Sequence, residues 1–95
     1  MGHGVLNIKK SLDMTGPNHT DIFYIGGKWE LSLTGTWTGT VYVLRRFRPE
    51  DDWGIVKEYT ENIEDSAYFQ GGSVAYYMVA VKTAGTGTCV VRCFK

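Results

Sequence analysis

The side chains best suited to acid–base catalysis in this chain are its two histidines, His3 and His19. A histidine titrates near neutral pH, so it can act as a general base when a nucleophile or a carboxylate stands beside it. Neither histidine has such a group at a recognisable spacing. We therefore expect solvated histidines, no catalytic residue and a non-enzymatic protein.

The two cysteines, Cys89 and Cys93, both lie in the last apolar run of the sequence. On a strand, this spacing puts both thiols on one face but roughly 13 Å apart. A disulfide needs Cα atoms within about 7 Å of each other. We expect reduced thiols that act as small apolar side chains, as in a reducing cytoplasm. An interchain bridge or metal ligation is the alternative.

Two acidic clusters offer oxygen ligands for a cation. They are the groups Glu50, Asp51 and Asp52, and Glu61, Glu64 and Asp65. Calcium takes about six to eight oxygen ligands in a shaped loop, and the D-x-[DN]-x-[DN]-G pattern of such a loop is not found in the sequence. We expect no metal ion and no cofactor.

The only basic cluster consists of Arg45, Arg46 and Arg48, with Phe47 between them. Arginines interleaved with an aromatic residue can contact nucleic acid. The first acidic cluster follows at once, however, across a turn that begins at Pro49. Ion pairing on a solvated hairpin end is therefore the favoured interpretation. Protein–protein recognition is the next alternative, and we expect no nucleic-acid partner.

Aromatic side chains are the remaining candidates for binding. Trp37 lies between glycines, where it could anchor a partner protein or fold back over the end of the domain. Trp29 and Trp53 begin strand patterns and are expected in the core, with a stacking platform for a sugar or base as the alternative. Tyr68 and Phe69 join Trp37 and the three arginines as candidate residues of a protein interface.

The elements that must position these residues are β-strands. Trp29, Leu31 and Leu33 alternate with polar residues, which is the period-two pattern of a half-buried strand. Other β-rich runs cover residues 5–10, 20–25, 40–47, 53–60, 73–82 and 88–94. Short turn segments separate the runs, as in a β-sandwich or barrel.

Three segments carry further expectations. We interpret residues 28–60 as a β-meander, and the run at 40–47, which is apolar on both faces, as a central strand. Residues 62–72 are the longest stretch without a regular pattern. Tyr76 and Tyr77, adjacent on a strand, must face opposite sides, so one is expected in the core and the other on the outer face of the sheet or in an interface.

Length and composition limit the possible architectures. The chain has 95 residues, 43% of them hydrophobic, which suits one compact domain. Its formal net charge is zero, so no overall field attracts a polyanion and little repulsion opposes self-association. No apolar stretch approaches the length of a membrane helix, and we expect no membrane partner. We predict an all-β fold, a single seven- to eight-stranded antiparallel β-sandwich of immunoglobulin-like or jelly-roll type. It spans residues 1–95, with 1–20 as a possible N-terminal arm.

The order of motifs from Gly35 onward is similar to that of a known group of proteins. It runs G-T-W-T-G-T-V-Y-V-L-R-R-F, an acidic turn and W-G-I-V-K-E-Y-T-E-N, and closes with Y-Y-M-V-A-V-K-T-A-G-T-G-T-C-V-V-R-C. This order resembles small β-sandwich proteins of tailed-bacteriophage virions, which occur as head decoration (cement) proteins and as tail or fibre modules. The turn here is P-E-D-D-W, without the glycine pair of the family, and residues 1–27 lie outside the resemblance.

The resemblance implies a structural role in a virion, with no active site to transfer to this chain. A capsid decoration protein would stabilise the head by contacts with the major capsid protein or other virion proteins. It would do so as a homo-oligomer, for which a trimer suits a lattice position. Its location would be the virion, after assembly in the host cytoplasm. Two alternatives stay open: a tail, adaptor or fibre component of the same kind of particle, and a carbohydrate-binding β-sandwich module.

Overall fold

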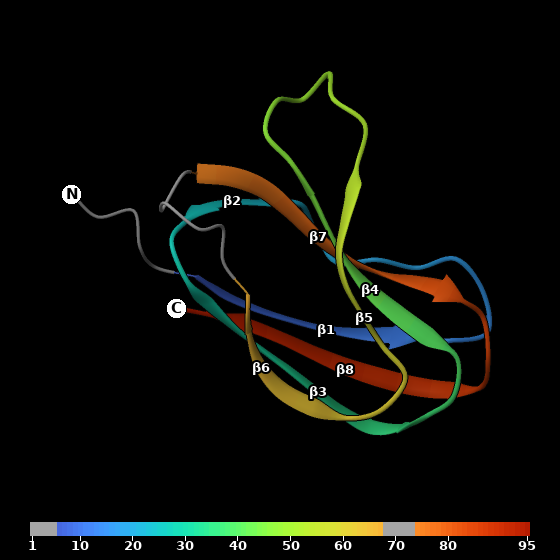
Figure 1. Ribbon diagram of the computed structural model, residues 1–95. Helices are drawn as coiled ribbons and strands as arrows, with labels where there is room; N and C mark the ends of the chain where they lie inside the picture. The colour runs from blue at the N-terminus through green and yellow to red at the C-terminus, as the bar shows by residue number, and fades with distance from the viewer. Residues whose placement is uncertain (1–5, 68–73) are drawn as a thin grey trace.

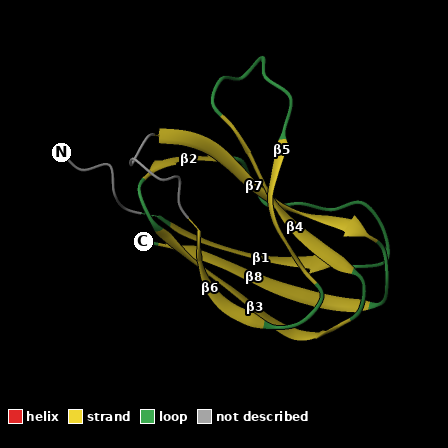
Figure 2. Cartoon of the chain, in the orientation of Figure 1, coloured by secondary structure: helices red, strands yellow, loops and turns green. Residues whose placement is uncertain are grey.

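The protein is a sandwich of two antiparallel β-sheets, as the computed structural model in Figures 1 and 2 shows. The structure describes residues 6–67 and 74–95. The strands in these ranges are β1 (Asn7–Asp13), β2 (Phe23–Gly26), β3 (Trp29–Trp37), β4 (Thr40–Arg46), β5 (Gly54–Tyr59), β6 (Ile63–Ala67), β7 (Val74–Thr83) and β8 (Gly87–Phe94). No helix occurs within the described ranges. The predicted all-β antiparallel sandwich is therefore confirmed, with eight strands.

The first sheet has the strand order β1-β8-β3-β6, and the second has the order β2-β7-β4-β5. β3 and β4 thus belong to different sheets, and the expectation of a β-meander over residues 28–60 is wrong for the step between them. Alternation along a strand shows which face is buried, but it does not select the neighbouring strand. Within that stretch, β4 and β5 do form a hairpin, and β4 is an inner strand of its sheet, as its apolar sequence predicted.

The core lies between the two sheets. Trp29, Leu31 and Leu33 of β3 are at most 1% exposed, as their alternation predicted. The Trp29 ring reaches the second sheet, where its centroid lies 5.1 Å from that of Phe23 and 5.2 Å from that of Tyr77. Both contacts are edge-to-face, the geometry that aromatic pairs favour. Trp29 therefore joins the two sheets, and Tyr77 is the core member of the adjacent tyrosine pair.

The beginning of the described chain is part of the sandwich. β1 pairs with β8 over its whole length, and Leu12 and Met14 are fully buried. Thr20 is also fully buried, and its hydroxyl accepts a hydrogen bond from the backbone N–H of Val79 in β7 (3.1 Å). Residues 7–20, which the sequence suggested as part of an arm, are thus built into both sheets of this structure.

Strand β6 was not anticipated from the sequence. Ile63–Ala67 pairs with β3, so the expectation of irregular structure over residues 62–72 is wrong as far as residue 67. The strand pattern is hidden because an inward position holds a carboxylate, Asp65, instead of an apolar residue. Asp65 accepts hydrogen bonds from the Lys57 ammonium (2.7 Å) and the Tyr59 hydroxyl (2.9 Å), which offset the cost of burying its charge.

Two runs rich in threonine and glycine, residues 34–40 and 83–88, meet at one end of the sandwich. The Thr38 N–H donates to the Thr86 carbonyl oxygen (2.9 Å), and the Thr86 N–H donates to the Thr38 hydroxyl (2.9 Å). A Cβ atom at Gly85 would stand 2.2 Å from the Thr38 carbonyl oxygen. Glycine is therefore required at position 85 for the two connections to pack together.

Candidate functional site

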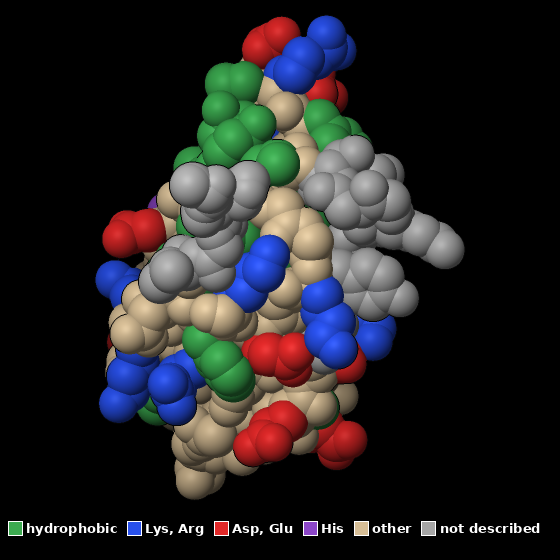
Figure 3. Space-filling view, turned by 90° about the vertical axis from the view of Figure 1, so that its left-hand side faces the viewer, with side chains coloured by type: hydrophobic (Ala, Val, Ile, Leu, Met, Phe, Trp, Pro, Cys, Tyr) green, Lys and Arg blue, Asp and Glu red, His purple; other side chains and the backbone are tan. Residues whose placement is uncertain are grey.

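The candidate site is the outer face of the second sheet, which we name the aromatic–arginine face. Its members form two rows across the strands: Tyr24, Tyr76, Arg46 and Trp53 in one row, and Met78, Leu44 and Ile55 in the next. Figure 3 views the molecule from one side and shows hydrophobic side chains gathered below its charged tip. Apolar side chains gathered on the outer face of a sheet are uncommon on a protein surface, which makes this face a candidate for interaction.

The first row begins with two tyrosines. Tyr24 of β2 lies directly opposite Tyr76 of β7, and their ring centroids are 4.5 Å apart. Cross-strand aromatic pairs of this kind stabilise a sheet and create a rigid apolar surface. Tyr24 remains 58% exposed, so most of its ring is available to a partner.

Arg46 of β4 continues the row beyond Tyr76. Its guanidinium carbon lies 4.3 Å from the centre of the Trp53 ring and 6.0 Å from that of Tyr76. These are cation–π distances, and they hold the guanidinium flat against the aromatic rings. The Arg46 Nε atom is buried without a hydrogen-bond partner. No described residue forms an ion pair with this arginine, so its charge is neutralised by no carboxylate of the described chain.

The second row is apolar throughout. Leu44 of β4 pairs with Met78 on one side and Ile55 on the other. Leu44 is only 6% exposed although it points away from the core, because its neighbours in the row cover it. Ile55, at the edge of the sheet, is 54% exposed. The face thus has a packed centre and an accessible rim.

The three arginines predicted as one cluster have separate environments. Arg46 lies on the aromatic–arginine face, whereas Arg45, one residue earlier, stacks on Phe47 at 5.3 Å from the ring centre. Arg48 forms the ion pairs expected at the hairpin end, with Asp51 at 3.3 Å and Glu50 at 3.8 Å. The structure thus shows the expected ion pairing for Arg48, which lies beyond the end of β4, in the turn that carries the two acids.

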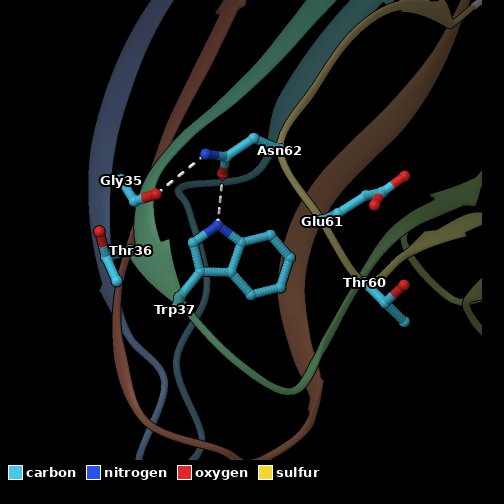
Figure 4. A pocket seen from close by; sticks show the side chains of 6 residues that line it. All are labelled: Gly35, Thr36, Trp37, Thr60, Glu61 and Asn62. Carbon is cyan, nitrogen blue, oxygen red and sulfur yellow. Dashed lines mark hydrogen bonds between the residues drawn. The ribbon is translucent and has the colours of Figure 1, made fainter.

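Trp37 lies at a different place, at the end of β3. Its indole N–H donates to the side-chain oxygen of Asn62 (2.7 Å), and the amide group of Asn62 donates to the Gly35 carbonyl oxygen (2.9 Å). These bonds hold the indole against the end of the core, as Figure 4 shows. Beside the ring is a shallow pocket of about 280 Å³, which Thr36, Thr60 and Glu61 also line.

The other aromatic candidates are divided among three environments. Trp29 is a core residue, but Trp53 is half-buried on the outer face under Arg46 instead of in the core. Tyr68 and Phe69 lie outside the described residues. The structure therefore does not unite the predicted interface residues in one surface, and Trp37 is remote in the fold from the arginine row.

Burial raises the pKa values of Cys89, Cys93 and Tyr59. Burial raises the pKa of the Cys89 thiol to about 11 and that of Cys93 to about 12. Both cysteines are free and buried, as predicted, and a thiol that stays protonated is a poor nucleophile. Burial, together with the nearby Asp65 carboxylate, raises the pKa of Tyr59 above its usual value. His19 lies with Nδ1 2.6 Å from the Thr20 carbonyl oxygen, to which the ring N–H donates.

Across residues 6–67 and 74–95, no three His, Cys, Asp or Glu side chains lie close enough together to hold a metal ion. Nor do these residues form a helix long and apolar enough to cross a membrane. His3 lies outside the described residues.

Sequence reasoning indicated Arg46 as an interface residue and one of Tyr76 and Tyr77 as an outer-face residue, but it missed the rest of the two rows of the aromatic–arginine face. Tyr24, Leu44 and Ile55 were not proposed as binding residues, because apolar residues in strand patterns were assigned to the core. A signal was nevertheless present: a run with apolar residues at every position leaves half of them outside a two-layer sandwich. Only the pairing of β2, β7, β4 and β5 assembles those residues in one place.

No family model, curated protein or solved structure matches this chain.

Proposed function

We propose that this protein is a non-enzymatic structural component of a tailed-bacteriophage virion, and specifically a capsid decoration (cement) protein. The motif order from Gly35 onward supports the virion assignment by resemblance. The aromatic–arginine face is the observation that carries the structural role, because it offers apolar side chains and one unneutralised arginine to another protein. The partners would be the major capsid protein or other virion proteins, together with further copies of this chain.

The mechanism is physical. A decoration protein binds the assembled lattice but not its separated subunits, so binding favours the assembled state by mass action. A ligand at 100 times its dissociation constant contributes about 2.7 kcal/mol in this way. A β-sandwich suits the role, since its sheets are rigid and present a surface that changes little on binding. No chemical step is needed.

The experiment compares purified heads and tails of the tailed phage that encodes this chain. The tagged protein is mixed with particles that lack it, and bound protein is measured after sedimentation. We expect saturable binding to heads and a higher rupture temperature for the decorated heads. Binding to tails alone would replace the decoration role by a tail, adaptor or fibre role. Binding to neither particle would contradict the virion proposal.

The pocket beside Trp37 favours a second candidate function, recognition of a carbohydrate. Its indole face stands next to hydroxyl, amide and carboxylate groups, the combination that sugars use for stacking and hydrogen bonding. A glycan array probed with the wild-type protein and with Trp37→Ala tests this function. Glycan binding that disappears in Trp37→Ala supports it, and no binding on the array contradicts it.

A further inference from the structure

We propose that the aromatic–arginine face is the contact between two copies of this chain. The two copies form an isologous, two-fold pair in which Asp52 of each copy meets Arg46 of the other. This inference deepens the proposed function, because it assigns a surface to the homo-oligomer that the function includes. It leaves other surfaces of the pair free for a capsid.

The apolar content of the face is the first observation. Ile22, Tyr24, Ile55 and Val74 are between 38% and 58% exposed, and all four lie on the second sheet or directly before one of its strands. The molecule measures 39 by 25 Å along its longer axes. A broad side of this size matches the roughly 800 Å² that each partner buries in a standard interface. The broad side of the molecule therefore offers room for a contact of that size.

The second observation is the charge on the face. Arg46 is held flat by Trp53, has a buried Nε atom without an acceptor and makes no ion pair with any described residue. The Nε atom is enclosed within the chain itself, but the two terminal Nη nitrogens of Arg46 are not among the buried atoms and have no acceptor in the described chain, so an oxygen of a docked partner can bind them. A carboxylate is the best match, because it accepts two parallel bonds from a guanidinium.

The chain itself carries the missing carboxylate. Asp52 is exposed and immediately precedes Trp53, whose ring lies under the Arg46 guanidinium. The other two acids of the turn, Glu50 and Asp51, already bind Arg48. No hydrogen bond or ion pair joins Asp52 to a described residue. One surface thus holds both an arginine without an acid and an acid without a base, which is the self-complementarity that a two-fold contact requires.

The remaining charges around the face favour a second copy over a strongly charged partner. Lys82 of β7 already pairs with Glu58 of β5, across the intervening strand β4, at 2.9 Å. The net charge of the chain is zero, so two copies do not repel each other at long range. An isologous pair is two-fold, so this face predicts a dimer and not the trimer that a lattice position suggested.

Sedimentation velocity between 1 and 200 µM gives the primary test. We expect the mass to rise with concentration from 10.7 kDa to twice that value. Ile55→Asp places a charge in the apolar row and should weaken dimerisation by at least about tenfold. The matched control is Val90→Asp, an apolar-to-acid change on the outer face of the first sheet, which should leave the dimer unchanged. Circular dichroism and thermal melting establish that each variant is folded.

A charge-swap experiment tests the Arg46–Asp52 contact directly. Arg46→Glu and Asp52→Arg should each dimerise more weakly, because each homodimer places like charges together. An equimolar mixture of the two variants restores two opposite-charge contacts in the heterodimer, and we expect it to recover the wild-type mass. If Arg46→Glu does not fold, Arg46→Gln replaces it. The Asp52→Arg homodimer contains two Arg–Arg contacts, whereas its heterodimer with Arg46→Gln contains none and regains one native contact between Arg46 and Asp52.

Three outcomes overturn the proposal: a monomer at 200 µM, a trimer, or a dimer that survives Ile55→Asp and dissociates in Val90→Asp. An unrestored mixture overturns the two-fold contact between Arg46 and Asp52. These results are independent of capsid binding. A dimer that ignores heads and tails supports this pairing and contradicts the virion role, whereas a monomer that binds heads does the reverse and leaves the face to a virion partner.

Discussion

The two outer faces of this sandwich differ in chemistry although they cover the same core. On the first sheet, one row of facing side chains is entirely polar: Lys9, Arg92, Ser32 and Glu64. On the second sheet, the aromatic–arginine face replaces such a row by tyrosines, a stacked arginine and aliphatic residues. In each sheet, the inward-facing residues form the core. The two sheets therefore differ in the residues that point outward.

This difference separates the requirements of folding from those of binding. A two-layer sandwich needs one apolar face per sheet, and the outer face of the first sheet adds a polar row to that, with Val90 and Phe94 as apolar exceptions. The second sheet has apolar residues beyond that requirement, and they remain accessible at its rim. The proposed pairing uses this apolar surface, so substitutions on the two faces should have different effects.

The largest expected effect tests whether the faces share one core. Trp29→Ala removes the ring that contacts Phe23 and Tyr77 across the sheets. We expect the free energy of unfolding to fall by about 3–5 kcal/mol. Urea denaturation followed by near-UV and far-UV circular dichroism should give one transition at lower urea. Two separate transitions would show that the sheets unfold independently. The two faces would then not cover one common core.

The next effect contrasts equivalent outer positions. Leu44 is nearly buried on the second sheet, so Leu44→Ala should cost about 2–3 kcal/mol, as in a core. Val90→Ala, on the outer face of the first sheet, should cost less than about 1 kcal/mol. Thermal and urea unfolding of both variants measure the difference. Equal costs for the two variants would remove the distinction between the faces.

Alkaline pH tests the inner side of the first sheet, where both thiols lie. Their folded pKa values, about 11 and 12, exceed the 9.0 of a free thiol. The stability that comes from keeping both thiols protonated in the folded state is therefore complete below about pH 9. It is lost as the pH rises through the folded pKa values. We expect a loss of about 1–2 kcal/mol at pH 10.5, after allowance for solvent screening. The Cys89→Ala, Cys93→Ala double variant should lose less free energy of unfolding between pH 8 and 10.5. The same pH dependence as in the wild type would show that the two thiols are not its cause.

A smaller effect is expected at the end that both sheets share. Asn62→Ala removes the acceptor of the Trp37 N–H and the donor to Gly35. Because the site is partly exposed, water can replace these bonds, and we expect a loss of about 1 kcal/mol. A change in the tryptophan emission maximum should accompany it. Asn62→Asp, which keeps the acceptor, serves as control and should retain most of the stability.

The smallest effect concerns an exposed ion pair beside the aromatic–arginine face. Glu58 and Lys82 are 2.9 Å apart, with 41% and 39% of their side chains exposed. Glu58→Gln should change the unfolding free energy by less than about 0.5 kcal/mol. A loss above 1 kcal/mol in urea unfolding would indicate that polar contacts, and not only apolar packing, hold the outer side of the second sheet.

Sequence patterns predicted the strands most reliably where burial alternates strictly. Trp29, Leu31 and Leu33 are inside as expected, and Cys89 and Cys93 share the inner face of β8. The pattern failed in β6, where Asp65 takes an inward position at the sheet edge. Of the candidate site, the sequence indicated Arg46 but not its separation from Arg48, since their contacts depend on neighbouring strands.

The sequence by itself determined that this chain forms strands and which residues of each strand share a side, because the pleat of an extended backbone is a local, covalent property. Tertiary structure alone decided which strands became neighbours. Hydrogen bonds between strands place Tyr24 and Arg46 in one row across Tyr76, although they are far apart in the sequence. The aromatic–arginine face exists only through that pairing.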